Sequence, residues 1–156
     1  MSHSRRLLLL LPAALLLARC GPAPKPPPVL TLTMVGSADQ NPDPSGNAAP
    51  VAVDVYQLTA TAKFESSDWT SLTQNETATL GQDEAAPAQQ FVVGPGETQT
   101  KTFELKTGVQ NIGIVVLYRD IDHAQWRAMA PAASSGPTKL TLNIAKAAIT
   151  LQPTKQ

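Results

Sequence analysis

The residues best equipped for chemistry lie close together in the second half of the chain, at Asp120, Asp122 and His123. A histidine held by a carboxylate can act as a general base, and these three side chains could also contribute to a metal site. A serine hydrolase needs a nucleophile as well, and the sequence has no Gly-x-Ser-x-Gly elbow. Zinc sites usually take three or four protein ligands. We therefore interpret the segment as a polar corner and expect neither a catalytic site nor a metal.

Two further groups of acidic residues fit known sites less well. The segment from Asp39 to Gly46 is rich in acids and prolines, but it lacks the alternating oxygen ligands and distal glutamate of a calcium loop. Asp83 and Glu84 are adjacent in a polar segment, whereas glycosidases need two carboxylates across a cleft. We interpret the first group as an Asx-rich turn and the second as part of a loop, and we expect no cofactor.

The polar corner follows an almost unbroken apolar run, residues 112–117, which predicts a strand buried on both faces. Arg119 and Arg127 flank the corner. They can pair with Asp120 or Asp122 as part of the structure, or they can recognise a partner. The sequence leaves both interpretations open.

Short strands separated by turn signals account for most of the remaining domain. Gly94-Pro95-Gly96 and Ser135-Gly136-Pro137 are typical turns. Spacing near ten residues favours an all-β, antiparallel sandwich of about eight strands. The predicted strands are Val29–Ala38, Val51–Leu58, Gln89–Val93, Gln99–Leu105, Gln110–Tyr118, Gln125–Met129, Lys139–Ile144 and Ala148–Leu151.

One segment, Phe64 to Gln74, predicts a short helix instead. Ser66 is a suitable N-cap, and Asp68 would lie in the first turn, where the helix dipole favours negative charge. Trp69 and Leu72 are three residues apart and share a face. We expect one or two helical turns packed on a sheet edge, with both side chains in the core.

The first 19 residues have the layout of a secretory signal peptide, with Arg5 and Arg6 before an apolar segment of twelve residues. That segment is too short to span a membrane. Leu17-Ala18-Arg19-Cys20 resembles a bacterial lipobox, although a small residue is expected in place of Arg19. We expect Cys20 to be lipidated. The alternative is an unmodified thiol at the end of an ordinary signal peptide.

Residues 20–28 predict a tether, because five prolines in residues 21–28 favour extended polyproline II. Cleavage before Cys20 would leave 137 residues with nine basic and twelve acidic side chains. This length suits one domain, residues 29–156. The mild acidic excess argues against a nucleic-acid-binding protein.

The ordered motifs of the domain resemble one family, the TssJ (SciN-type) lipoproteins of type VI secretion systems. The resemblance extends from about Val29 to Leu151. The motifs that carry it are Pro50–Leu58 with its Tyr-Gln-Leu ending, Phe64, Asp68, Trp69 and Leu72 of the helix, Leu80-Gly81-Gln82-Asp83, Pro95-Gly96, and the Tyr118-Arg119-Asp120 corner with Trp126-Arg127.

The resemblance implies a transthyretin-like sandwich with a short added helix and no catalytic activity. It implies an outer-membrane lipoprotein on the periplasmic face that binds the periplasmic C-terminal region of TssM, with no small-molecule substrate. Gly21, which is not the aspartate that retains lipoproteins in the inner membrane, is in keeping with this location. The loop that matches the family's contact loop consists of Asp39, Gln40, Asn41, Pro42, Asp43, Pro44, Ser45, Gly46 and Asn47.

Two other functions fit the same fold. A periplasmic binding module for a small ligand or glycan would line its pocket with exposed Trp126 or Trp69. A periplasmic hydrolase would need a cleft around His123.

Overall fold

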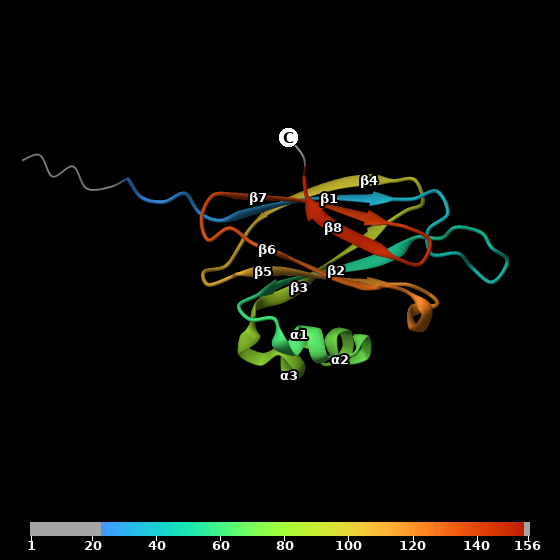
Figure 1. The fold of residues 1–156 in the computed structure, drawn as a ribbon, viewed down its shortest axis with the longest axis horizontal. Coiled ribbons are helices and arrows are strands. Elements are labelled where there is room, and N and C mark those ends of the chain that lie inside the picture. The colour runs from blue at the N-terminus through green and yellow to red at the C-terminus, as the bar shows by residue number, and fades with distance from the viewer. Residues whose placement is uncertain (1–22, 155–156) are drawn as a thin grey trace, which may run out of the picture.

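The computed structural model describes residues 23–154, in which eight strands form two facing four-stranded sheets (Figure 1). The first sheet has the strand order β4-β1-β7-β8, and the second has the order β3-β2-β5-β6. The strands are β1 (Val29–Gly36), β2 (Val51–Leu58), β3 (Glu84–Val93), β4 (Thr98–Glu104), β5 (Asn111–Leu117), β6 (Arg127–Pro131), β7 (Pro137–Ile144) and β8 (Ile149–Pro153). The predicted all-β sandwich of eight strands is confirmed, and its arrangement is consistent with a transthyretin-like fold.

The pairing of the strands differs from the prediction in one place. Five of the six pairings are antiparallel, but β1 and β7 run parallel, with Leu32 opposite Leu140. Parallel neighbours need a long connection, and most of the chain lies between these two strands. β3 also begins at Glu84, earlier than expected, because its first residues are largely polar or small and give no hydrophobic alternation.

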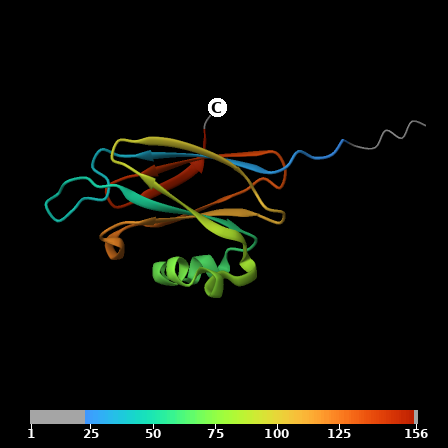
Figure 2. The same ribbon diagram turned by 180° about the vertical axis from the view of Figure 1, so that it is seen from behind.

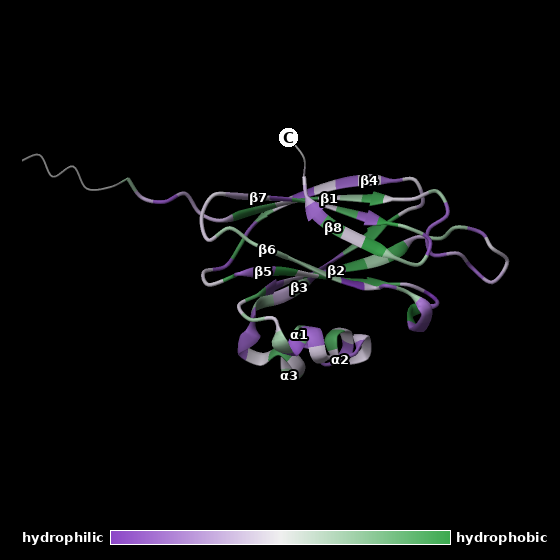
Figure 3. Cartoon of the chain, in the orientation of Figure 1, coloured by the Kyte–Doolittle hydropathy of each residue, from purple (hydrophilic) through white to green (hydrophobic). Residues whose placement is uncertain are grey.

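Alternate residues of the inner strands fill the space between the sheets. Leu30, Leu32 and Met34 of β1 are fully buried and pack in one cluster with apolar residues of β2 and β5. Thr31 and Thr33 lie between them in sequence and face outward, because side chains alternate along a strand. Figure 3 shows this alternation as hydrophobic bands on the strands, while the loops are mostly polar.

A second, smaller core lies on the outer face of the β3-β2-β5-β6 sheet. Three short helices cover this face: α1 (Ala62–Ser66), α2 (Trp69–Gln74) and α3 (Glu76–Leu80) (Figure 1). They are followed by a single 3₁₀ turn, η1 (Gly81–Asp83). The cluster consists of Tyr56, Leu58, Phe64, Leu72, Leu80 and Val115. The prediction that residues 112–117 form a strand buried on both faces is therefore confirmed for β5.

The prediction of one helix on a sheet edge was wrong in three respects. The segment is broken at Ser67, which has extended backbone angles, and Ser66 ends α1 and does not cap a helix. Asp68 is the N-cap of α2 and accepts a hydrogen bond from the Ser71 N–H at 2.8 Å. The helices also cover a sheet face. Leu72 is fully buried as expected, whereas Trp69 is only partly buried.

Different segments of the chain lie at the two ends of the sandwich. Residues 23–28 leave from one end, and the loop of residues 37–50 protrudes at the opposite end (Figures 1 and 2). Within residues 23–154, none of the helices combines the length and hydrophobicity of a transmembrane span.

Candidate functional site

The loops at the end opposite the tether form one continuous surface, which we call the loop end: residues 37–50, 94–97, 118–126 and 145–148. Backbone hydrogen bonds join them. The Asn41 N–H donates to Lys146 O at 3.1 Å, the Gly96 N–H to Ser37 O at 3.2 Å, and the Gln125 N–H to Ala147 O at 2.9 Å. Loops on a rigid sheet scaffold commonly carry binding function. The loop end is therefore the candidate site.

Two buried amides hold the base of the 37–50 loop. Gln40 is fully buried and donates from Nε2 to Val93 O at 2.7 Å. Asn41 has a φ of 45°, which asparagine tolerates. Both polar atoms of its side chain form hydrogen bonds. Its Nδ2 donates to Pro50 O at 2.8 Å, and its Oδ1 accepts from the Arg119 N–H at 2.8 Å. Both side chains therefore position the loop and do not face solvent.

The tip of this loop is a tightly bonded Asx turn. The Asp43 carboxylate accepts hydrogen bonds from the N–H groups of Asn47 and Ser45, both at 2.9 Å. These bonds, the one from Asn47 first, hold the pKa of Asp43 below its usual value. Gly46 has a φ of 86°, which closes the turn. Pro44, Ser45, Gly46 and Asn47 are exposed, so the structure presents this part of the predicted contact loop to solvent in an ordered form.

The polar corner fixes the neighbouring loops and is not arranged for catalysis. The buried Tyr118 hydroxyl is shared between the carbonyls of Ala145 at 3.0 Å and Ala148 at 2.9 Å, and burial raises its pKa. His123 lies at the surface with Nδ1 2.7 Å from Asp120 Oδ1, and this hydrogen bond raises the pKa of the histidine. An exposed pair of this kind lacks the enclosed cleft and adjacent nucleophile that a hydrolase requires.

The two arginines that flank the corner have separate roles. Arg127 does not pair with Asp120 or Asp122. Its guanidinium donates to the carbonyls of Phe64 at 2.7 Å and Ser67 at 2.8 Å, so it fastens β6 to the end of α1. Arg119 is exposed on the loop end. The predicted pairing with the acids is therefore wrong for Arg127, which has a structural role elsewhere, and Arg119 stays exposed.

Trp126 lines an open hollow with Ala124, Gln125, Arg127 and Ile149, but its ring is not exposed as a glycan-binding module would need. It is partly buried, and the Arg127 guanidinium lies 4.9 Å from its ring centroid. Trp69 is likewise partly buried against the sheet. Sugar stacking needs an open aromatic face, so neither tryptophan favours the glycan-binding alternative.

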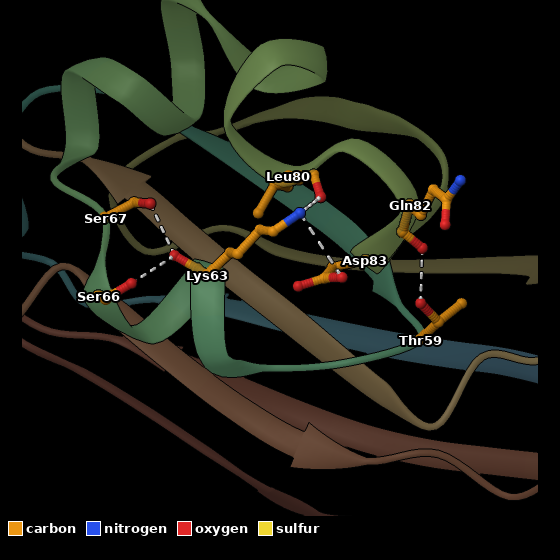
Figure 4. A network of polar contacts seen from close by, with 7 residues as sticks. All are labelled: Thr59, Lys63, Ser66, Ser67, Leu80, Gln82 and Asp83. Carbon is orange, nitrogen blue, oxygen red and sulfur yellow. Dashed lines mark hydrogen bonds and ion pairs between the residues drawn. The ribbon is translucent and has the colours of Figure 1, made fainter.

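The adjacent acids lie where the helical layer meets the sheet, since Asp83 ends η1 and Glu84 begins β3. Asp83 lies 3.8 Å from the Lys63 ammonium, which also donates to Leu80 O at 3.0 Å and so ties α1 to α3 (Figure 4). Glu84 points to a different environment, where burial and the neighbouring Glu76 raise its pKa to about 8. Among the described residues, no three His, Cys, Asp or Glu side chains converge as metal ligands would.

Two hollows lie side by side on the loop end and share Pro42 and Asp120. The smaller has a volume of about 140 Å³ and is lined by Asn41, Pro42, Tyr118, Asp120, Lys146 and Ala147. The larger, of about 380 Å³, is lined by Pro42, Asp43, Pro44, Arg119 and Asp120. Sequence reasoning missed Lys146 and Ala147, because they follow the 37–50 loop by about a hundred residues and no motif marks them.

Two facing four-stranded sheets, with ordered loops gathered at one end and a helical layer on one outer face, define a β-sandwich domain with added helices. Residues 28–147 match the T6SS-SciN family model, described as type VI secretion lipoprotein, VasD, EvfM, TssJ. The chain belongs to this family of type VI secretion lipoproteins. It is therefore a membrane-anchored, non-enzymatic component of a type VI secretion system.

Several solved structures share this fold. The T6SS lipoprotein TssJ1 from Pseudomonas aeruginosa is 27% identical with a TM-score of 0.79, over 84% of this chain and 99% of that one. Lip from Serratia marcescens, a membrane-bound component of the type VI secretion system, is 21% identical with a TM-score of 0.73, over 83% and 98%. A chain of the structure described as the C-terminal domain of the T6SS protein TssM from EAEC is 21% identical with a TM-score of 0.68, over 81% and 99%. Among curated proteins, none matches this sequence.

Proposed function

We propose that this protein is the outer-membrane lipoprotein of the type VI secretion membrane complex and that its loop end binds the periplasmic C-terminal region of TssM. The observation that carries the proposal is the opposition of the tether and the loop end across the sandwich (Figure 1). A protein fixed to a membrane at one end presents its far end to the space beyond. The ordered, exposed tip of the 37–50 loop lies at that far end.

The preorganisation of the loop end supports binding to a protein partner. Asp43 holds the tip, and Asn41 holds the base of the loop to the Arg119 backbone. A loop that is already ordered loses less conformational entropy when a partner docks. Its exposed residues therefore have a fixed geometry before the complex forms.

The anchor in this proposal is Cys20, which lies outside the described residues. Residues 20–28 are the proposed tether, and its last part already contacts the domain. Pro26 O accepts from the Gly136 N–H at 3.2 Å, and Pro28 O accepts from the Leu105 N–H at 2.9 Å. The spacer that remains, residues 20–25, would span about 19 Å as polyproline II. The domain would therefore stand close to the inner leaflet of the outer membrane.

The test is a replacement of residues 43–47 by a Gly-Ser pair in the full-length protein. The replacement must spare Gln40 and Asn41, because these amides hold β3, β2 and the corner together. We expect binding to the purified periplasmic region of TssM, measured by calorimetry in detergent, to weaken at least tenfold, about 1.4 kcal/mol. Unchanged binding by the folded variant would place the contact elsewhere.

The matched control is Thr107→Glu. Thr107 is exposed in the β4–β5 connection at the tether end of the sandwich. This substitution should leave the affinity for TssM unchanged, whereas equal losses in both variants would contradict a contact at the loop end.

A further inference from the structure

The smaller hollow of the loop end has the size of one side chain. Its volume is about 140 Å³, and a cavity of about 150 Å³ in another protein is large enough to bind benzene. A leucine or phenylalanine side chain therefore fits, whereas a folded element does not. Its walls come from three separate loops, at residues 41–42, 118–120 and 146–147.

Internal hydrogen bonds hold these walls in place. The Tyr118 hydroxyl bonds to the carbonyls of Ala145 and Ala148, which fixes the β7–β8 turn that carries Lys146 and Ala147. The Asn41 side chain bonds to the Arg119 N–H, which fixes the first wall to the second. The pocket is thus formed before any partner arrives.

The same bonds determine what the pocket accepts. The polar groups of Asn41 and the hydroxyl of Tyr118 already have partners within the protein. Asp120 is engaged at the surface by His123. The ring of Pro42, the ring of Tyr118 and the methyl group of Ala147 present apolar surface. Lys146 and the second carboxylate oxygen of Asp120 are the polar groups left for an occupant, and both also reach solvent. An apolar occupant leaves no new polar group unsatisfied.

The charge of the loop end indicates which kind of residues lies next to the inserted side chain in the partner. The loop end as a whole carries five acidic residues, Asp39, Asp43, Glu97, Asp120 and Asp122, against two basic residues, Arg119 and Lys146. The lining of the pocket itself has one of each sign, Asp120 and Lys146. A surface with excess negative charge attracts a positively charged partner segment and disfavours an acidic one.

We propose that the pocket formed by Pro42, Tyr118 and Ala147 receives one apolar side chain, of leucine or phenylalanine size, from a segment of the partner that also carries basic residues. This inference rests on the proposed function and specifies how the partner is held. A few side chains that fill well-packed, desolvated pockets usually carry most of the affinity at protein interfaces.

The test fills the pocket from the protein's own side. Ala147→Phe and the smaller Ala147→Val should weaken binding of the full-length protein to the periplasmic region of TssM in that order, at least tenfold for phenylalanine. Ala145→Phe is the matched control, because Ala145 is exposed in the same turn but does not line the pocket. Because Ala145 lies on the loop end outside the pocket, this substitution should weaken binding less than Ala147→Phe. Thermal melting of each variant confirms that it is folded.

Salt separates the two parts of the proposal. Raising the salt concentration should weaken binding of the wild type, because ions screen attraction between exposed charges. The loss of affinity caused by Ala147→Phe, expressed as a ratio to the wild type, should persist at high salt, because apolar burial is not screened. Binding by the wild type that does not weaken with salt would overturn the basic character of the segment.

The outcomes distinguish this inference from the proposed function. If the wild-type protein does not bind TssM, the proposed function fails. If the wild type binds and Ala147→Phe binds equally well or more tightly, the anchor pocket is overturned while the proposed function stands. Equal losses for Ala145→Phe and Ala147→Phe would also overturn it, because the effect would then come from the turn and not from the pocket.

Discussion

At the scale of single residues, Gly113 decides whether the helical layer can close on the sheet. A Cβ atom at this position would lie 2.8 Å from the Phe64 ring and 3.0 Å from Leu58 Cδ1. We therefore expect Gly113→Ala to lower the free energy of unfolding by about 1–3 kcal/mol, the usual cost of overpacking a core. Denaturant unfolding measures the loss. The penalty should shrink in a Phe64→Leu background, which gives the added methyl group room, and an equal penalty in both backgrounds would contradict this explanation.

At the scale of elements, the contact between α3 and β3 carries a pH dependence. The Glu84 carboxyl lies near Glu76, and its Oε1 is buried without a hydrogen-bond partner in the described structure. Burial, and then Glu76, raise the pKa of Glu84 from 4.5 to about 8. The folded state therefore retains a proton that the unfolded state has lost, so stability falls as pH rises from about 4.5 to 8.

Glu84→Gln removes this charge and should flatten the dependence. We expect its melting temperature to exceed that of the wild type at pH 9, with little difference at pH 4, as measured by thermal unfolding across that range. Glu104→Gln, on exposed β4, is the control and should follow the wild type. A constant offset between Glu84→Gln and the wild type at every pH would contradict the assignment.

At the scale of the whole molecule, the described part of the proposed tether and the proposed binding surface lie at opposite ends of the sandwich. If Cys20 carries the acyl chains, Cys20→Ser should release the protein from the membrane fraction or leave it uncleaved. Release is expected because acyl chains stabilise membrane attachment by about 0.8 kcal/mol per buried methylene. Secretion should be lost together with the attachment. Mass spectrometry of the N-terminus and fractionation measure both effects. A soluble wild-type protein with an unmodified N-terminus would contradict the proposal.

Arg19→Gly tests the processing step separately. The signal peptide of this variant should be cleaved faster if the arginine slows cleavage.

The sequence by itself determined the features that depend on local pattern. Alternation of apolar residues marks most of the strands, since side chains on a strand repeat every two residues. The unbroken run of residues 112–117 identifies a strand covered on both faces. The ordered motifs from Pro50 to Arg127 identify the family, and the proposed contact loop, which stays a prediction, was inferred from its match to that family.

The tertiary structure decided what depends on residues far apart in the chain. Nothing near Gln40 and Asn41 shows that they turn inward, because their partners Val93 and Arg119 are distant in sequence. Arg127 stabilises the break at Ser67. Its guanidinium donates hydrogen bonds to the carbonyls of Phe64 and Ser67 and does not pair with the acids that are close to it in sequence. The parallel pairing of β1 with β7 joins distant segments within one sheet, and the pocket that includes Lys146 and Ala147 arises only when three separate loops meet. Such contacts carry no local periodicity, so packing alone selects them.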